Sequence, residues 1–169
     1  MEHNEQKIQI IGIGEIGTSF DNNTILKTVL GSCVAVLLYS TTEPVATLSH
    51  FLLAESENNS KEIYSSENLR YGNHILEKQF SIMDEHTKVY ASIQAKIFGG
   101  ATVKYQNATP ILSEIGQNNI AIAQHILNKK SIPVVASHIG GNSGMSISYN
   151  PQTKMTEIHL FKDDSHLIL

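Results

Sequence analysis

The chain has 169 residues, 41% of them hydrophobic, and a formal net charge of −4. This length favours a single domain over residues 1–169, with enough chain to bury a sizeable core. The acidic balance and the single arginine, Arg70, argue against a nucleic-acid partner and against binding to anionic lipid.

The single cysteine and the N-terminal residues indicate the cellular compartment of the protein. Cys33 cannot form a disulfide within the chain, so an oxidising compartment is not indicated. Residues 1–7 are polar and lack the apolar region of a signal peptide. The apolar runs are far shorter than the ~20 residues that cross a bilayer. We therefore expect a cytoplasmic protein without membrane insertion.

The first third of the chain is expected to consist of strands. Residues 7–15 predict a strand that ends in glycines, and residues 23–31 predict a second strand. Residues 33–40 and 45–53 predict two more, joined by a hairpin-length turn at residues 41–44. The continuous apolar character of these last two strands indicates burial on both faces.

Two helices are expected further along the chain. Residues 54–68 are polar and predict an exposed loop, after which a helix is predicted from about residue 67 to residue 84. A second amphipathic helix is predicted over residues 116–129. The apolar stripe of the first helix consists of Leu69, Leu76, Phe80 and Met83.

The remaining segments complete an α+β pattern. Residues 89–100 and 132–141 predict strands that end in Gly-Gly pairs, and residues 145–161 predict two strands around a turn at 150–153. Strands and helices are segregated rather than alternating, which favours an α/β sandwich of the α+β type, with mixed sheets and two main helices. If the glycine-terminated strand ends cluster, their backbones can approach a ligand closely. These glycines lie at 12–14, 31, 99–100 and 140–141.

Cys33 is the first candidate for a reactive side chain. Gly31 and Ser32 ahead of it mark a break between two strands, so the thiol is expected at a strand end that a substrate can reach. Backbone N–H groups at such a bend could stabilise an oxyanion. The alternative is a buried and inert cysteine, the usual state of a lone one.

His50 is the best candidate for a base, because antiparallel pairing of the predicted hairpin would bring it close to Cys33. A neighbouring imidazole can lower the pKa of a thiol from ~8.5 to ~3.5–7.5, so we expect a partly ionised Cys33. The alternative is a core or strand-edge histidine with a satisfied hydrogen bond.

The other histidines carry weaker signals. His74 and His125 fall in the predicted helices, and His138 precedes the second Gly-Gly pair, where it could line the same site. The sequence has no H-x-x-x-H or C-x-x-C spacing, so a structural zinc site is not expected. The glycine-rich residues 12–17 lack a following helix and predict a strand end rather than a dinucleotide-binding loop.

Five segments have an order and spacing that is typical of one protein family: LGSCVAVLLY (30–39), LSHFLL (48–53), AKIFGGA (95–101), IGQNN (115–119) and IGG (139–141). Together they resemble the CheD family of chemoreceptor glutamine deamidases, over almost the whole chain. The resemblance implies a three-layer α/β sandwich, similar to the catalytic domain of bacterial toxins that deamidate glutamine with a Cys–His pair.

The resemblance also implies a mechanism. Cys33 would be the nucleophile that attacks the side-chain amide of a glutamine, and His50 would be the general base that later protonates the leaving ammonia. Water would then hydrolyse the thioester to glutamate, with no cofactor and no metal. The implied partners are chemoreceptor cytoplasmic domains and a CheC-type phosphatase that competes with the receptor for the same surface.

Three positions depart from the family pattern. The family has a threonine six residues before the cysteine, where this chain has Lys27, so Lys27 is expected beside His50. Thr28 lies one residue later and would take that place only if a bulge or register change re-aimed it. The family's arginine in the IGQNN segment is Asn118 here, and the loop at residues 140–147 lacks the family's arginines, which bears on partner docking.

Two other functions fit the same residues. The first is a CheD-like adaptor that binds receptor or phosphatase with weak or no catalysis, favoured by Lys27 and the missing arginines. The second is a cysteine amidase or peptidase with another substrate. Conversion of glutamine to glutamate in a receptor fragment would separate the deamidase from both.

Overall fold

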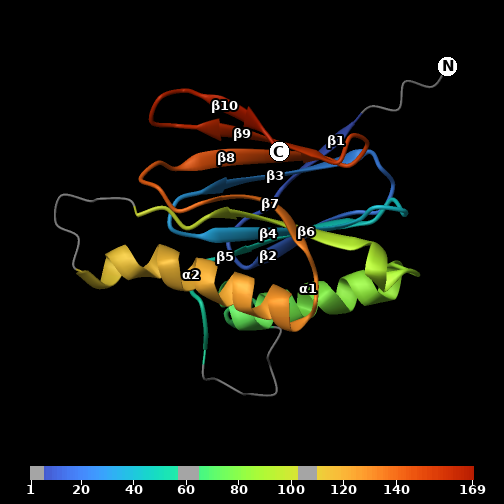
Figure 1. Ribbon diagram of the computed structural model, residues 1–169, viewed down its shortest axis with the longest axis horizontal. Helices are drawn as coiled ribbons and strands as arrows, with labels where there is room; N and C mark the ends of the chain where they lie inside the picture. Colours follow the sequence, from blue (N-terminus) through green and yellow to red (C-terminus); the bar gives the residue numbers. More distant parts are fainter. Residues whose placement is uncertain (1–5, 57–64, 103–109) are drawn as a thin grey trace.

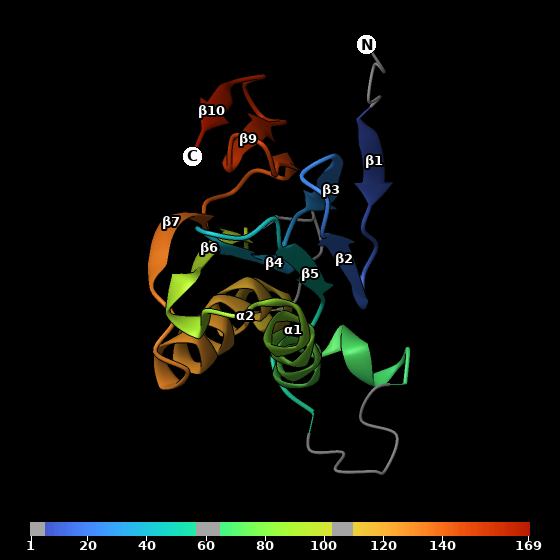
Figure 2. The same ribbon diagram turned by 90° about the vertical axis from the view of Figure 1, so that its right-hand side faces the viewer.

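The computed structural model describes residues 6–56, 65–102 and 110–169. These residues form ten strands in two five-stranded sheets, two α-helices and two short 3-10 helices. The sheets stack face to face, and both α-helices cover the outer face of one sheet (Figures 1 and 2). This arrangement is the α+β sandwich that the sequence predicts, with the three layers that the family resemblance implies. Within the described residues, neither helix has the length and apolar character of a membrane-spanning segment.

The first sheet has the strand order β1-β3-β8-β9-β10, and the second has the order β2-β5-β4-β6-β7. The first consists of β1 (Lys7–Ile10), β3 (Thr24–Leu30), β8 (Met145–Asn150), β9 (Met155–Leu160) and β10 (His166–Ile168). The second consists of β2 (Glu15–Ser19), β5 (Ala46–Phe51), β4 (Val34–Ser40), β6 (Ile93–Gly99) and β7 (Val134–Ile139). Each contains one parallel pair, β1–β3 and β6–β7, so both sheets are mixed.

Strand β4 lies at the centre of the molecule and is buried along its whole length, as its continuous apolar sequence predicts. Val34, Val36 and Leu38 face the helices, where they join one hydrophobic core. Ala35, Leu37 and Tyr39 point the other way, into the layer between the sheets, together with Cys33. Both cores therefore meet at this strand.

The helices match the predicted segments, with different starting points. Helix α1 (Gly72–His86) begins five residues later than expected, because Asn68–Arg70 form a separate 3-10 helix, η1, and Tyr71 is extended. The predicted apolar stripe is buried. Helix α2 (Pro110–Lys129) begins six residues earlier than expected and ends where predicted.

The strands differ from the prediction at three places. Residues 7–15 form β1 and then a turn, and β2 begins only at Glu15. The start of the segment at 89–100 is a 3-10 helix, η2 (Tyr90–Ser92), followed by β6. Strand β10 was not expected. Much of the predicted exposed loop at 54–68, residues 57–64, lies outside the described residues.

Candidate active site

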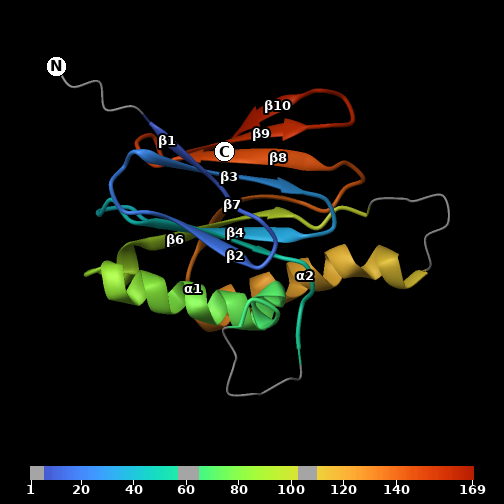
Figure 3. The ribbon, with the colours of Figure 1, turned by 180° about the vertical axis from the view of Figure 1, so that it is seen from behind.

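Cys33 lies where the chain crosses from the first sheet to the second, between the end of β3 and the start of β4 (Figure 3). Backbone hydrogen bonds from the end of β6 hold this crossing: Gly100 N donates to Cys33 O at 2.8 Å, and Ala101 N donates to Gly31 O at 2.8 Å. Gly99 has φ +96°, and a Cβ there would lie 2.2 Å from Cys33 O. Only glycine fits at this position, which explains the Gly-Gly pair of the AKIFGGA segment.

His50 lies near the end of β5, the strand that pairs with β4. In this antiparallel register Ala35 lies opposite His50. Cross-strand partners point to the same face, and so do residues two apart in a strand, so Cys33 and His50 are diagonal neighbours on the face between the sheets. The two side chains that the sequence paired are therefore brought together, 8% and 4% exposed.

A third side chain, Thr28 of β3, completes the arrangement. Its Oγ1 donates to Ile11 O at 2.7 Å and lies 2.9 Å from His50 Nδ1. Since the hydroxyl has one proton and gives it to a carbonyl, it must accept from His50. Nδ1 therefore carries the imidazole proton, and Nε2 carries the free lone pair. Nε2 is buried, with no hydrogen-bond partner in the described part of the chain.

The expectation that Lys27 stands beside His50 is wrong. In β3 the inward residues are Leu26, Thr28 and Leu30, while Lys27 is exposed on the other face. The strand pairs with β8 in continuous register over these residues, without a bulge. A shift that turned Lys27 inward would expose both leucines, so the hydrophobic pattern places the hydroxyl at the site.

Burial governs the ionisation of the pair. It raises the pKa of Cys33 above its usual range, an effect that the main-chain N–H of Cys33 only partly offsets. Burial also lowers the pKa of His50, while the Ile11 carbonyl and the Glu15 carboxylate act in the opposite direction. Both shifts favour the neutral form of the group, which is opposite to the expectation of a partly ionised thiol.

Asn119 of α2 is a residue whose role the sequence did not reveal. It is fully buried, and its Nδ2 donates to Ser32 O at 3.1 Å and to Leu52 O at 2.9 Å. Ser32 precedes the nucleophile candidate, and Leu52 lies two residues after the base candidate. One amide therefore joins the two strand ends that present Cys33 and His50. Its place in the IGQNN segment was the only sequence signal.

The glycine-terminated strand ends gather around the same crossing, the arrangement in which their backbones can approach a ligand closely. Gly14 N donates to His50 O at 2.7 Å, and Gly140 N donates to Gly99 O at 2.9 Å. Gly116 of α2 packs against this group, since a Cβ there would lie 2.4 Å from Gly100 O. Close packing therefore requires glycine at Gly99, Gly100 and Gly116, whereas a Cβ at Gly140 or Gly141 would have open space around it. Residues 12–14 form the turn between β1 and β2, and residues 15–17 already belong to β2, so no helix follows this glycine-rich segment.

The weaker candidates lie elsewhere. His74 is buried in α1 and His125 is exposed on α2. His138 of β7 pairs with Phe98 and lines a separate cavity of about 260 Å³ with the loop after β7. Neither Cys33 nor His50 lines that cavity, so the structure does not bring His138 into the arrangement.

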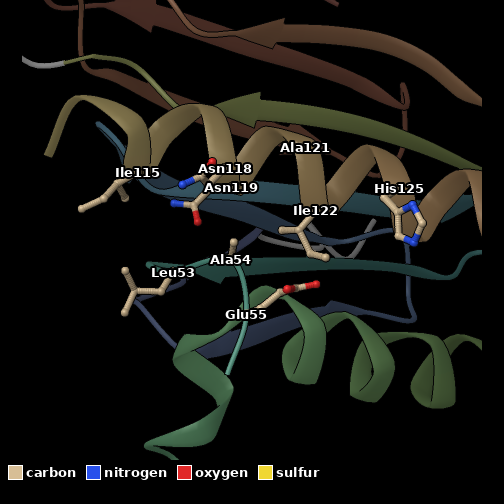
Figure 4. A pocket seen from close by; sticks show the side chains of 9 residues that line it. All are labelled: Leu53, Ala54, Glu55, Ile115, Asn118, Asn119, Ala121, Ile122 and His125. Atoms are coloured by element: carbon tan, nitrogen blue, oxygen red, sulfur yellow. The ribbon is translucent and has the colours of Figure 1, made fainter. Parts of the chain in front are cut away.

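A cavity of about 680 Å³ lies between α2 and the segment after β5 (Figure 4). Its lining residues are Leu53, Ala54, Glu55, Ile115, Asn118, Asn119, Ala121, Ile122 and His125. Neither Cys33 nor His50 lines it, so the cavity is separate from the two candidate reactive side chains. Asn119 is the residue that it shares with the Cys33 and His50 strand ends.

Comparison with known proteins gives a consistent result. The family model described as CheD chemotactic sensory transduction matches residues 52–160. A "Probable chemoreceptor glutamine deamidase CheD 2" of Shewanella oneidensis is 36% identical over 153 residues, which cover 89% of this chain and 75% of the relative. A "Chemoreceptor glutamine deamidase CheD" of Halalkalibacterium halodurans is 30% identical over 148 residues, covering 88% and 90%.

Proposed function

The chain belongs to the CheD family, and on this premise we propose that it is a chemoreceptor glutamine deamidase in which Cys33 is the nucleophile and His50 the general base. Its substrates are glutamine side chains of chemoreceptor cytoplasmic domains. The reaction is hydrolysis of the side-chain amide to glutamate and ammonia.

The hydrogen bonding of the His50 imidazole is the observation that supports this proposal most directly. Thr28 holds the imidazole through Nδ1, which leaves a buried Nε2 without a partner on the face that also presents Cys33. A base for a thiol needs this tautomer, because the nitrogen that takes the proton must be unprotonated beforehand. An imidazole with both nitrogens satisfied would support the structural alternative instead.

The neutral pair favours proton transfer during attack rather than a stored thiolate. As the sulfur of Cys33 bonds to the amide carbon, His50 Nε2 takes the thiol proton, and the carbonyl oxygen becomes an oxyanion. The main-chain N–H of Cys33, which lies close enough to the sulfur to affect its pKa, is a candidate donor to that oxyanion.

The second half of the reaction returns the enzyme to its starting state. Protonated His50 gives its proton to the amide nitrogen, the C–N bond breaks, and ammonia leaves a thioester on Cys33. His50 then takes a proton from water, whose oxygen attacks the thioester carbon. The C–S bond breaks, the proton returns to sulfur, and glutamate is released.

The test is incubation with a chemoreceptor cytoplasmic fragment, read by peptide mass spectrometry for conversion of glutamine to glutamate. Wild-type protein is expected to convert specific glutamines, and Cys33→Ser and His50→Ala are expected to lose conversion, since losing one member of such a pair costs on the order of 10⁶ in turnover. His125→Ala, an exposed histidine on α2, is the matched control. Near-normal conversion by folded His50→Ala would contradict the assignment of the base.

We further propose that a CheC-type phosphatase competes with the receptor for this protein. Family membership supports this partner, whereas the absence of arginine from residues 140–147 weakens the expected docking surface. Added phosphatase should slow receptor deamidation in proportion to its concentration. Unchanged rates would show that this member has lost the interaction. Binding of receptor by wild-type protein without any conversion would support the adaptor function.

A further inference from the structure

Three potential metal ligands converge on the hairpin of β9 and β10. His159 of β9 lies opposite His166 of β10, and their rings stack with centroids 4.5 Å apart. Asp164 lies in the turn between the strands, and its Oδ1 accepts from His159 Nε2 at 2.5 Å. One ligand atom from each residue lies within 4.8 Å of both others.

The fold sets this cluster apart from the Cys33 site. Ile158 of β9 is fully buried in the layer between the sheets. Because side chains alternate along a strand, His159 and its cross-strand partner His166 point to the outer face of the first sheet. Figure 1 shows β9 and β10 as the strands of the first sheet that lie farthest from the helices. A ligand bound there would not contact Cys33 or His50.

The turn places Asp164 where the two histidines can share a ligand with it. Asp164 has a positive φ of 57°, which reverses the chain before β10. The neighbouring Asp163 is already engaged, since its Oδ1 accepts from the backbone N and the hydroxyl of Ser165. Asp164 is free of those bonds in the turn and turns back to His159.

We propose that His159, Asp164 and His166 form a binding site for a divalent transition-metal ion, of which Zn²⁺ is the best match. Imidazole nitrogen with one carboxylate is a donor set that zinc prefers and that Mg²⁺ and Ca²⁺ do not. Three protein ligands leave a fourth tetrahedral position for water. The two histidines are paired across neighbouring strands, so they do not show the short sequence spacing, such as H-x-x-x-H, by which metal ligands are usually recognised.

Metal binding requires only small side-chain movements. Ligand atoms around zinc lie about 3.3 Å apart when each is about 2.1 Å from the metal. The His159–Asp164 contact must therefore open slightly, and His166 must close on the pair. The Asp164 side chain is 88% exposed and that of His159 is 34% exposed, so solvent leaves room for both shifts.

The bound ion would cross-link the edge strand β10 to its neighbour β9. Strand β10 has three residues, all exposed, and pairs only with β9 among the described strands. An ion joining β9, the turn and β10 would hold this strand in place. Zinc is therefore expected to raise the midpoint of thermal unfolding in a concentration-dependent way.

The experiment is titration of the full chain with ZnCl₂ at pH 7.5, followed by calorimetry, with Co²⁺ absorption as a second readout. Cys33 and His50 are themselves a potential zinc site, so Cys33→Ser is titrated in parallel. We expect wild-type and Cys33→Ser proteins to bind one ion with equal affinity. His159→Ala and His166→Ala are expected to bind at least ten-fold more weakly, whereas the exposed His125→Ala is expected to bind normally.

Each other outcome would overturn the proposal. Absence of zinc binding by wild-type protein would show that the cluster is only a hydrogen-bonded surface group. Loss of binding in Cys33→Ser would place the ion at the cysteine, and unchanged binding in His159→Ala and His166→Ala would place it elsewhere. Because His166 is exposed and His159 is about one third exposed, circular dichroism should show a native fold in both variants, and deamidation by them should be unchanged.

Discussion

At the scale of single residues, the burial of Cys33 and His50 decides how the pair reacts. Burial raises the pKa of the thiol and lowers that of the imidazole, so both shifts favour neutral groups in the resting protein. The proton therefore moves only when a substrate carbonyl is in place to accept the sulfur. Such a resting state would protect the lone thiol from oxidation and alkylation, which act on thiolates.

Alkylation of Cys33 by iodoacetamide tests this state. An ordinary thiol with a pKa of ~8.5 is about 3% ionised at pH 7, and Cys33 should be ionised less than that. We expect slow labelling at pH 7, with a rate that rises at a midpoint above the pKa of a free thiol. The rate is measured by mass spectrometry across pH, with the urea-unfolded chain as control. A midpoint below 8.5 would reveal a stored thiolate and contradict the neutral pair.

Variants of Thr28 test its role as the positioning residue of His50. Thr28→Val removes the acceptor of the Nδ1 proton, so the imidazole loses its fixed tautomer. We expect kcat for receptor deamidation to fall about 10²-fold, within the range that a positioned general base contributes, with little change in KM. Thr28→Ser should restore most of the activity because it keeps the hydroxyl.

Lys27→Thr is the matched control on the same strand. Lys27 is exposed on the opposite face, so this variant should deamidate at the wild-type rate. Faster deamidation by Lys27→Thr, together with full activity of Thr28→Val, would show that Lys27 and not Thr28 faces His50.

At the scale of elements, α2 connects the segment before β4 to the segment after β5 through hydrogen bonds. Gly116 brings the helix against the Gly100 carbonyl, and Asn119, one turn later, reaches Ser32 and Leu52. The helix thereby connects the segment before Cys33 to the segment after His50. A regular helix can hold such loops at fixed separation because its own backbone is rigid.

Asn119→Leu tests this support. The variant removes the amide that donates to two part-buried carbonyls and leaves the space of a buried side chain to an apolar one, so we expect the free energy of unfolding to fall by about 2 kcal/mol. Because the strand ends lose their common donor, kcat should fall at least ten-fold in protein that remains folded, with KM less affected. Urea unfolding and deamidation kinetics measure the two effects.

The control for Asn119 is Asn128→Leu, the same substitution at an exposed position of α2. It should leave stability and kcat unchanged. A folded Asn119→Leu protein with normal kcat would mean that Asn119 serves stability alone and does not position the reacting pair.

At the scale of the whole molecule, Lys96 is a polar link between the two sheets. It lies in β6 of the second sheet, and its Nζ donates to Lys154 O at 2.8 Å and to Leu169 O at 2.7 Å. Both acceptors flank strand β9 or β10 of the first sheet. Nζ also lies 5.6 Å from the ring centre of Tyr39, and burial lowers the lysine pKa. The sheets are therefore joined by directed bonds as well as by the apolar layer.

Lys96→Met tests this link. The thioether fills similar space but donates to neither carbonyl, so we expect a loss of about 2 kcal/mol in the free energy of unfolding. Urea unfolding measures it, with Lys27→Met as the exposed matched control. Equal stability of the two variants would show that packing alone joins the sheets.

Much of the architecture follows from local pattern. The continuous apolar run of β4, the alternation in β8 and β9 and the stripe of α1 each identified an element, because burial on one or both faces imposes a period on the sequence. Starting points were predicted less well. Helix α1 begins late because η1 intervenes, and β2 was missed because its polar residues carry no apolar period.

The sequence by itself determined the fold class and made Cys33 and His50 a candidate pair, since both depend on short-range pattern and hairpin register. Only the tertiary structure decided which hydroxyl meets the imidazole, what Asn119 holds and which ligands converge on the outer hairpin. Thr28 lies 22 residues from His50, and Asn119 lies 87 residues from Ser32. Such partners are chosen by how sheets and helices stack, and that packing leaves no period in the chain that a local reading could detect.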